Sequence, residues 1–96
     1  GPDPAGKRPQ ACLGNANGMS CPDEWSTMLQ CAFQRHFPGE VTVNRPFSGG
    51  YITRFHGTEM PWIQLELSRG AFATPEEKSR WVSASLRDAV AQIAEL

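Results

Sequence analysis

The stretch WIQLEL at residues 62–67 alternates apolar and polar side chains. A period of two is typical of a β-strand that has one apolar face and one polar face. We expect the apolar side chains to join a core and the polar face to carry Gln64, Glu66 and Ser68. The fold must therefore cover one face of this strand, whereas the other face is open to solvent or lines a cleft.

Two amphipathic helices are predicted, one before and one after the strand region. The first is expected to be capped by Ser20, to hold Pro22 in its first turn and to end at Pro38. Its apolar face comprises Trp25, Met28, Leu29, Ala32, Phe33 and His36. The second helix begins with the capping box TPEE at residues 74–77. Its buried stripe is predicted to comprise Val82, Leu86, Ala89, Val90 and Ile93, with Trp81 beside it.

Three further strands are predicted at residues 11–13 (ACL), 41–43 (VTV) and 51–54 (YITR). The loops between the later strands are too short for helical crossovers, so at least one pair of strands should be antiparallel. The sequence therefore predicts an α/β fold in which a mixed sheet is layered with helices. Residues 1–96 are expected to form a single domain or part of a larger one, with residues 1–10 as a flexible loop or end.

The composition argues against several classes of protein. The 96-residue chain is 40% hydrophobic and 20% charged, which is typical of a globular domain. A net charge of -1 and the lack of a Lys/Arg cluster argue against nucleic-acid binding. No apolar run approaches about 18 residues, which argues against a membrane span.

The cysteines form an odd set, Cys12, Cys21 and Cys31, without a Cys-x-x-Cys pair. This pattern favours reduced thiols in a cytoplasmic protein over a disulfide framework or a zinc knuckle. Cys12 and Cys31 are expected to be buried small hydrophobes.

The segment NRPFSGGYITRFHG at residues 44–57 is rich in groups that can bind or react. Its Gly-Gly pair lets the backbone turn sharply or lie close to a ligand. The guanidinium of Arg54 suits a carboxylate ligand, although a surface ion pair is the alternative. Glu66 is either a solvent-exposed carboxylate or a general base in a cleft, where Gln64 could orient the same ligand.

Histidine offers little for a metal site. His36 and His56 are the two histidines, and a His-x-x-x-His spacing does not occur. Zinc sites use three or four ligands, so no residue of this chain is assigned as a metal ligand. His36 is expected to be a capping or surface histidine, because a helix C-terminus favours an imidazolium.

The pattern NxPFxGGYITR at residues 44–54, followed by QLEL at 64–67, resembles the N-formylglutamate amidohydrolase (N-formylglutamate deformylase) family. The segment RPxxCLG at residues 8–14 resembles the same family in the matching order. The likeness covers most of the chain and corresponds to the C-terminal portion of that family's domain. It implies a fold similar to zinc carboxypeptidases and the hydrolysis of N-formyl-L-glutamate to formate and glutamate, late in histidine degradation.

The resemblance also implies roles for individual residues. Glu66 would be the acid/base that activates a zinc-bound water, and Arg54 would hold a carboxylate of a small acidic N-acyl amino acid. The remaining substrate-binding residues would be Asn44, Gly50, Tyr51, Thr53 and Gln64. The family's Pro-His-Ser-Gly and Asp-x-His-Ser motifs, which carry its metal ligands, are not in this sequence, so zinc ligands are expected outside this chain. The chain alone is therefore expected to be inactive, and its partners would be the missing N-terminal part of the domain or a second copy.

Two differences from the family pattern bear on these roles. Phe55-His56-Gly57 stands where the family commonly has His-Tyr-Gly, so the histidine is shifted by one residue, which on a strand turns it to the other face. The Leu-Tyr-Met-like segment after the glutamate strand is matched only loosely by residues 70–73. An alternative function is a non-catalytic, truncated module that binds an acidic ligand or a partner chain.

Overall fold

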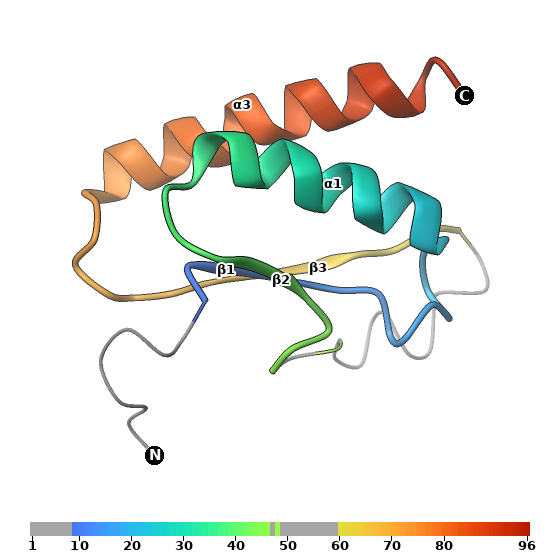
Figure 1. Cartoon of the computed structure of the whole chain (residues 1–96), viewed down its shortest axis with the longest axis horizontal. Coiled ribbons are helices and arrows are strands. Elements are labelled where there is room, and N and C mark those ends of the chain that lie inside the picture. Colours follow the sequence, from blue (N-terminus) through green and yellow to red (C-terminus); the bar gives the residue numbers. More distant parts are fainter. Residues whose placement is uncertain (1–8, 47, 49–59) are drawn as a thin grey trace.

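A three-stranded mixed sheet, covered on one face by two helices, forms the body of the molecule (Figure 1). The computed structural model describes residues 9–46, 48 and 60–96. The element order is β1 (Ala11–Gly14), α1 (Asp23–His36), β2 (Val41–Val43), β3 (Gln64–Leu67) and α3 (Pro75–Ile93). The predicted α/β fold is confirmed, while the strand predicted at residues 51–54 and most of the expected flexible end lie outside the described residues.

Strand β1 lies in the middle of the sheet, in the order β2-β1-β3. It is parallel to β2, where Leu13 stands opposite Val43, and antiparallel to β3, where Cys12 stands opposite Glu66. The parallel pair requires a crossover, which α1 supplies between the two strands. The predicted antiparallel pair is therefore confirmed in the pairing of β1 with β3.

The hydrophobic core fills the space between the sheet and the helices. From the strands it takes the alternate residues Ala11, Leu13, Val41, Val43, Leu65 and Leu67. From the helices and the loop after α1 it takes Leu29, Ala32, Phe33, Phe37, Trp81, Val82 and Ala89. Phe37 stacks on Phe33 and meets Trp81 edge-on, with ring centroids 5.8 Å and 5.3 Å away. The apolar face expected for β3 is thus confirmed. That of α1 is confirmed for Leu29, Ala32 and Phe33, whereas Trp25, Met28 and His36 are only half-buried and lie outside the core cluster.

The two helices meet through small side chains on α3. Ser85 and Ala89 are fully buried, and the Ser85 hydroxyl donates a 2.6 Å hydrogen bond to the Trp81 carbonyl. Small residues let helix backbones approach closely, so the side of α3 that carries Ser85 and Ala89 packs against α1. The predicted stripe is correspondingly wrong in part, because Leu86 and Val90 are 44% and 63% exposed.

The ends of the helices differ in how well local signals predicted them. Helix α1 begins at Asp23 with Pro22 at its N-cap and has no side-chain cap, so the predicted capping by Ser20 is wrong. Helix α3 has the predicted capping box: the Glu77 N–H donates to Thr74 Oγ1 at 3.1 Å, and the Thr74 N–H donates to Glu77 Oε1 at 3.0 Å. Hydrogen bonds from the backbone and hydroxyl of Thr74 hold the pKa of Glu77 below its usual value.

None of the three cysteines, all of which lie in the described part of the chain, takes part in a disulfide. Cys12 and Cys21 are buried, but Cys31 is exposed, so its predicted burial is wrong. Helix α1 turns Leu29 and Phe33 toward the core, and Cys31 lies on another side of the helix. Separately, none of the described helices is both long and apolar enough to cross a membrane.

Candidate functional site

The face of the sheet turned away from the helices is polar. Thr42, Cys12 and Glu66 stand opposite one another across β2, β1 and β3, so the three side chains form one row. Cys12 and Thr42 are buried in this row, whereas Glu66 at its end is exposed. Because Leu65 and Leu67 point into the core, the intervening carboxylate must face the other way. An exposed carboxylate on a sheet face is free to meet a ligand.

Gln64 shares this face with Glu66. It stands opposite Gly14 at the start of β3, two residues before Glu66 and therefore roughly 7 Å away along the strand. The prediction that these two side chains lie on one face is confirmed. Gly14 has no side chain, so no side chain of β1 stands directly opposite Gln64.

Asn44 lies directly after β2, at the same end of the sheet as Gln64. Its N–H donates to the Leu13 carbonyl at 2.8 Å, which extends the ladder between β1 and β2 by one bond. Its backbone has a φ of 60°, a left-handed conformation that asparagine tolerates better than most residues. The chain therefore turns sharply as it leaves β2, and the Asn44 carboxamide is placed against the end of β1.

The partner of that carboxamide is Asn15, a residue the sequence analysis did not single out. The Asn15 N–H donates to Asn44 Oδ1 at 3.0 Å, and Asn44 Nδ2 donates to Asn15 Oδ1 at 2.6 Å. Asn15 Oδ1 also accepts the Gly18 N–H at 2.9 Å, and Asn15 Nδ2 donates to Ser26 Oγ at 2.7 Å. The signal that could have identified it is an asparagine in a glycine-rich turn immediately after a buried strand, where Asx turns are frequent.

Loops from several parts of the chain meet at this end of the sheet. The Trp62 N–H donates to the Ser20 carbonyl at 2.7 Å, and the Ala16 N–H donates to the Ser48 carbonyl at 2.6 Å. Ligands of open α/β sheets bind outside the carboxyl ends of the parallel strands, which here are the ends of β1 and β2. We define the candidate site by the residues Asn15, Asn44, Gln64 and Glu66.

Two buried polar atoms near this end lack a partner. Ser20 Oγ and Trp62 Nε1 make no hydrogen bond in the described part of the chain. Buried donors are nearly always satisfied in folded proteins. An oxygen atom of a water or a ligand would be stabilised beside either of them.

Several residues predicted to bind substrate lie outside the described residues. These are Gly50, Tyr51, Thr53 and Arg54, and the same holds for His56. The substrate-binding roles predicted for the first four therefore stay predictions.

The described residues do not fit a zinc ion by themselves. Among residues 9–46, 48 and 60–96, no group of three or more His, Cys, Asp and Glu side chains could hold a metal. His36 is half-buried at the end of α1, where its Nε2 lies 2.7 Å from Asp88 Oδ2 of α3. The expectation of a surface or capping histidine is consistent with this hydrogen-bond contact between helices, which lies on the helix side of the sheet.

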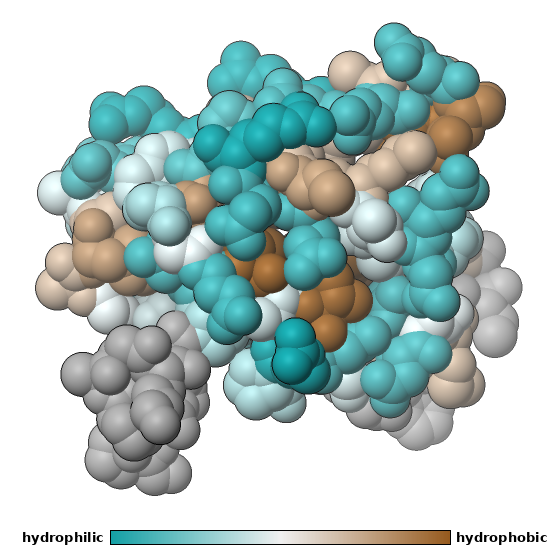
Figure 2. Space-filling view, viewed as in Figure 1, coloured by the Kyte–Doolittle hydropathy of each residue, from teal (hydrophilic) through white to brown (hydrophobic). Residues whose placement is uncertain are grey.

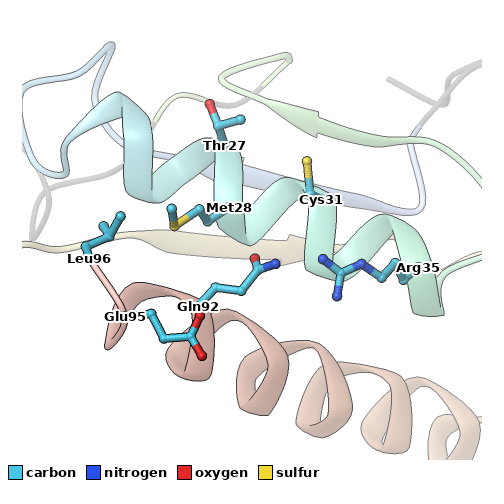
Figure 3. A pocket seen from close by; sticks show the side chains of 7 residues that line it. All are labelled: Thr27, Met28, Cys31, Arg35, Gln92, Glu95 and Leu96. Carbon is cyan, nitrogen blue, oxygen red and sulfur yellow. The ribbon is translucent and has the colours of Figure 1, made fainter.

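A shallow groove of about 500 Å³ lies between α1 and the C-terminal end of α3 (Figure 3). Its lining residues are Thr27, Met28, Cys31, Arg35, Gln92, Glu95 and Leu96. Hydrophilic residues dominate the view in Figure 2, and hydrophobic ones form smaller patches, one of them at the end of α3, where Leu96 is exposed. The groove belongs to the helix layer and contains none of the four residues of the candidate site.

Comparison with known proteins identifies a family. Residues 1–73 match the family model of N-formylglutamate amidohydrolase. The matched range contains β1, α1, β2 and β3, and thus all four residues of the candidate site. Neither the curated proteins nor the solved structures contain a match to this chain.

Proposed function

We propose, since the chain belongs to the N-formylglutamate amidohydrolase family, that its polar sheet face takes part in hydrolysing the C–N bond of an N-acyl amino acid. The substrate we propose is N-formyl-L-glutamate, which water converts to formate and glutamate. The observation that carries this proposal is the exposed Glu66 carboxylate, which shares one sheet face with Gln64 at the end where Asn44 lies. By the same family argument, the reaction is proposed to serve histidine degradation in the cytoplasm.

Glu66 is assigned as the general base and acid. Its carboxylate accepts a proton from the attacking water while the water oxygen bonds to the formyl carbon. The same proton is then given to the nitrogen as the C–N bond breaks, so that glutamate leaves with a neutral amine and the formyl group leaves as formic acid, which releases its proton to water and becomes formate. A carboxylate that projects from a strand into solvent can approach a bound substrate without unfolding the sheet.

The substrate-binding groups flank this carboxylate. Gln64, from the same face of β3, donates a hydrogen bond to the substrate, and Asn44 does so from the end of β2. Arg54 binds a substrate carboxylate through two parallel N–H bonds, a geometry that a planar guanidinium favours. Gly50, Tyr51 and Thr53 line the same pocket in this proposal.

Zinc is the proposed cofactor, with its ligands outside this chain. The described residues hold no group of side chains that could bind it. When bound, zinc would polarise the carbonyl oxygen of the substrate and lower the pKa of a water. We place its ligands on the rest of the family's domain or on a second copy of the chain, which are also the partners we propose.

The test of the proposed reaction is formate release from N-formyl-L-glutamate by a protein in which the upstream part of the family's domain precedes residues 1–96, in the presence of zinc. Glu66→Gln should lower the rate by about 10²- to 10⁴-fold, as expected for the loss of a general base. Glu40→Gln, a change at an exposed loop carboxylate outside the site, is the control and should leave the rate unchanged. Normal turnover by Glu66→Gln would rule out the assigned base.

A related experiment addresses ligand binding without turnover. Calorimetric titration of the chain with N-formyl-L-glutamate should show an affinity that falls at least tenfold in Arg54→Ala, because a charge-assisted bidentate contact is lost. Equal affinity in the wild type and in Arg54→Ala would contradict the role of Arg54. Binding by the chain without formate release, once zinc and the upstream part are present, would favour the non-catalytic module instead.

A further inference from the structure

We propose that Asn15 is a positioning residue that fixes the side-chain amide of Asn44, so that one Nδ2–H of Asn44 is presented to an acceptor oxygen of the ligand. The assignment of that ligand rests on the proposed function, whereas the positioning itself rests on the contacts of Asn15. These contacts join the loop after β1 to the residue after β2, which are 29 positions apart in the chain.

The two contacts determine the orientation of the Asn44 amide. Its Oδ1 accepts the backbone N–H of Asn15 at 3.0 Å, and its Nδ2 donates to Asn15 Oδ1 at 2.6 Å. A flipped amide would place Nδ2 against the N–H donor and Oδ1 against the oxygen of Asn15. Both contacts would then be repulsive, and amide orientations are assigned from such networks. Asn15 therefore admits a single orientation.

The hydrogen-bond donors and acceptors of the Asn44 amide that Asn15 does not use define which ligand groups it can bind. A carboxamide has two N–H donors and an oxygen with two lone pairs. Asn15 occupies one donor and one lone pair of the Asn44 amide. The Asn44 side chain makes no other hydrogen bond within the described part of the chain. The second N–H is left to an acceptor. The carbonyl and carboxylate oxygens of an N-acyl amino acid are acceptors of this kind.

Asn15 is itself held rigidly. It is 0% exposed, and its Nδ2 donates to Ser26 Oγ at 2.7 Å, Asp23 Oδ1 at 3.2 Å and the Cys21 carbonyl at 3.4 Å. Three acceptors compete for two hydrogens, so the amide cannot rotate without losing several bonds. Because α1 supplies two of these acceptors, the position of Asn44 is tied through Asn15 to the start of that helix.

The experiment measures the affinity for N-formyl-L-glutamate of Asn15→Ala, Asn44→Ala and the double variant. Each single change should weaken binding about tenfold, the effect of one hydrogen bond to a charged or polar ligand. The double variant should bind no more weakly than the weaker single variant, because both changes remove the same presented N–H. Multiplying effects, or wild-type affinity in Asn15→Ala, would overturn the proposal.

Ser26→Ala is the control for a merely structural role. It removes an acceptor of Asn15 Nδ2 but leaves both contacts between Asn15 and Asn44 in place. It should lower the stability of the fold while the affinity stays within twofold of the wild type. If affinity instead follows stability equally in Ser26→Ala and Asn15→Ala, Asn15 only supports the fold and the proposal is wrong.

A measurement without ligand separates this proposal from the proposed function. In ¹⁵N NMR spectra, the bonded Nδ2 proton of Asn44 should exchange with water at least tenfold faster in Asn15→Ala than in the wild type or in Ser26→Ala. If Asn15→Ala does not fold, Asn15→Ser is used, because its hydroxyl can still accept the Gly18 N–H in a turn but does not reach Asn44. Slow exchange that depends on Asn15, in a protein that does not bind N-formyl-L-glutamate, would refute the proposed substrate and uphold the positioning. Unchanged exchange would refute the positioning whatever the ligand result.

Discussion

At the residue scale, Asp88 connects the two helices by charge. Its Oδ2 lies 2.7 Å from His36 Nε2 and 3.8 Å from Arg35 Nη1. The hydrogen bond from His36, followed by the charges of His36, Arg35 and Arg87, holds the pKa of Asp88 below its usual value. A carboxyl whose pKa is lower in the folded protein stabilises the fold at pH values above its unfolded pKa, near 4. That contribution is lost as the pH falls through the lower, folded pKa.

Asp88→Asn should therefore destabilise the protein at pH 7, and the difference from the wild type should shrink as the pH is lowered below about 4. Urea unfolding of both proteins at pH 7 and at about pH 3 measures this difference. Ser79→Ala, at an exposed position of α3 that carries no charge, serves as the control and should show no such pH dependence. A difference that grows in acid would contradict the assigned sign.

Of the candidate site, the sequence predicted Asn44, Gln64 and Glu66 but not Asn15. Alternation in β3 was enough to place Gln64 and Glu66 on one polar face. Asn15 was not found, because its importance comes from partners such as Ser26 and Asn44, which lie 11 and 29 residues away. Local periodicity carries no information about such contacts. Cys31 was misplaced for a similar reason, since burial on a helix depends on what packs against it.

At the element scale, the start of α3 is stabilised by local hydrogen bonds. Thr74→Ala removes the hydroxyl that accepts the Glu77 N–H and should lower the free energy of unfolding by about 1 kcal/mol. Thr74→Ser should retain most of the stability, because serine caps as well as threonine does. Ser79→Ala, at an exposed position in the same helix, is the control. Denaturant unfolding measures the free energy of unfolding of each variant. Equal stability of Thr74→Ala and Ser79→Ala would contradict the role of the cap.

The contact between α1 and α3 gives a second prediction at this scale. Ala89 is fully buried there, whereas Ala91 is exposed on the same helix. Ala89→Leu should cost about 1–3 kcal/mol, because a larger side chain forces the helices apart. Ala91→Leu adds the same atoms on the exposed side and should change stability by less than about 0.5 kcal/mol. Thermal or urea unfolding of the two variants compares them directly, and equal losses would show that the helices do not meet at Ala89.

The helices illustrate what local signals determine. Pro75 and the capping box of Thr74 and Glu77 placed the start of α3 correctly, because each acts within one turn. The buried side of α3 was predicted from apolar residues, but the close approach of α1 favours the small Ser85 and Ala89. Tertiary packing thus overrides the apolar pattern, and Leu86 is left partly exposed.

At the scale of the whole molecule, β1 is the most enclosed element. All four of its residues are buried, and it pairs with a strand on each side. Its amide protons should exchange only through global unfolding, whereas those in the last turn of α3 should exchange through local opening. Hydrogen exchange followed by NMR at increasing denaturant tests this order within one sample. Exchange in β1 as fast as that at residues 90–96 would contradict it.

An antiparallel pair was predicted from the short loops between the later strands, but the observed pair is β1 with β3, which α1 and β2 separate in the chain. The order of the strands could not be predicted, because β1 pairs with β2 and β3 through contacts between residues far apart in the sequence. The meeting of Asn44 and Gln64 at one end of the sheet follows from that order. The candidate site therefore depends on topology as much as on its residue types.

The unequal exposure of the three thiols makes the chain convenient to label. Cys31 is exposed at the edge of the groove on the helix layer, while Cys12 and Cys21 are buried and burial raises the pKa of Cys21. A maleimide dye should consequently attach to one position of the native protein and to three after denaturation. Mass spectrometry would then report unfolding as a count of attached dyes, and a fluorophore at this single position would be a probe of the helix layer that needs no engineered cysteine.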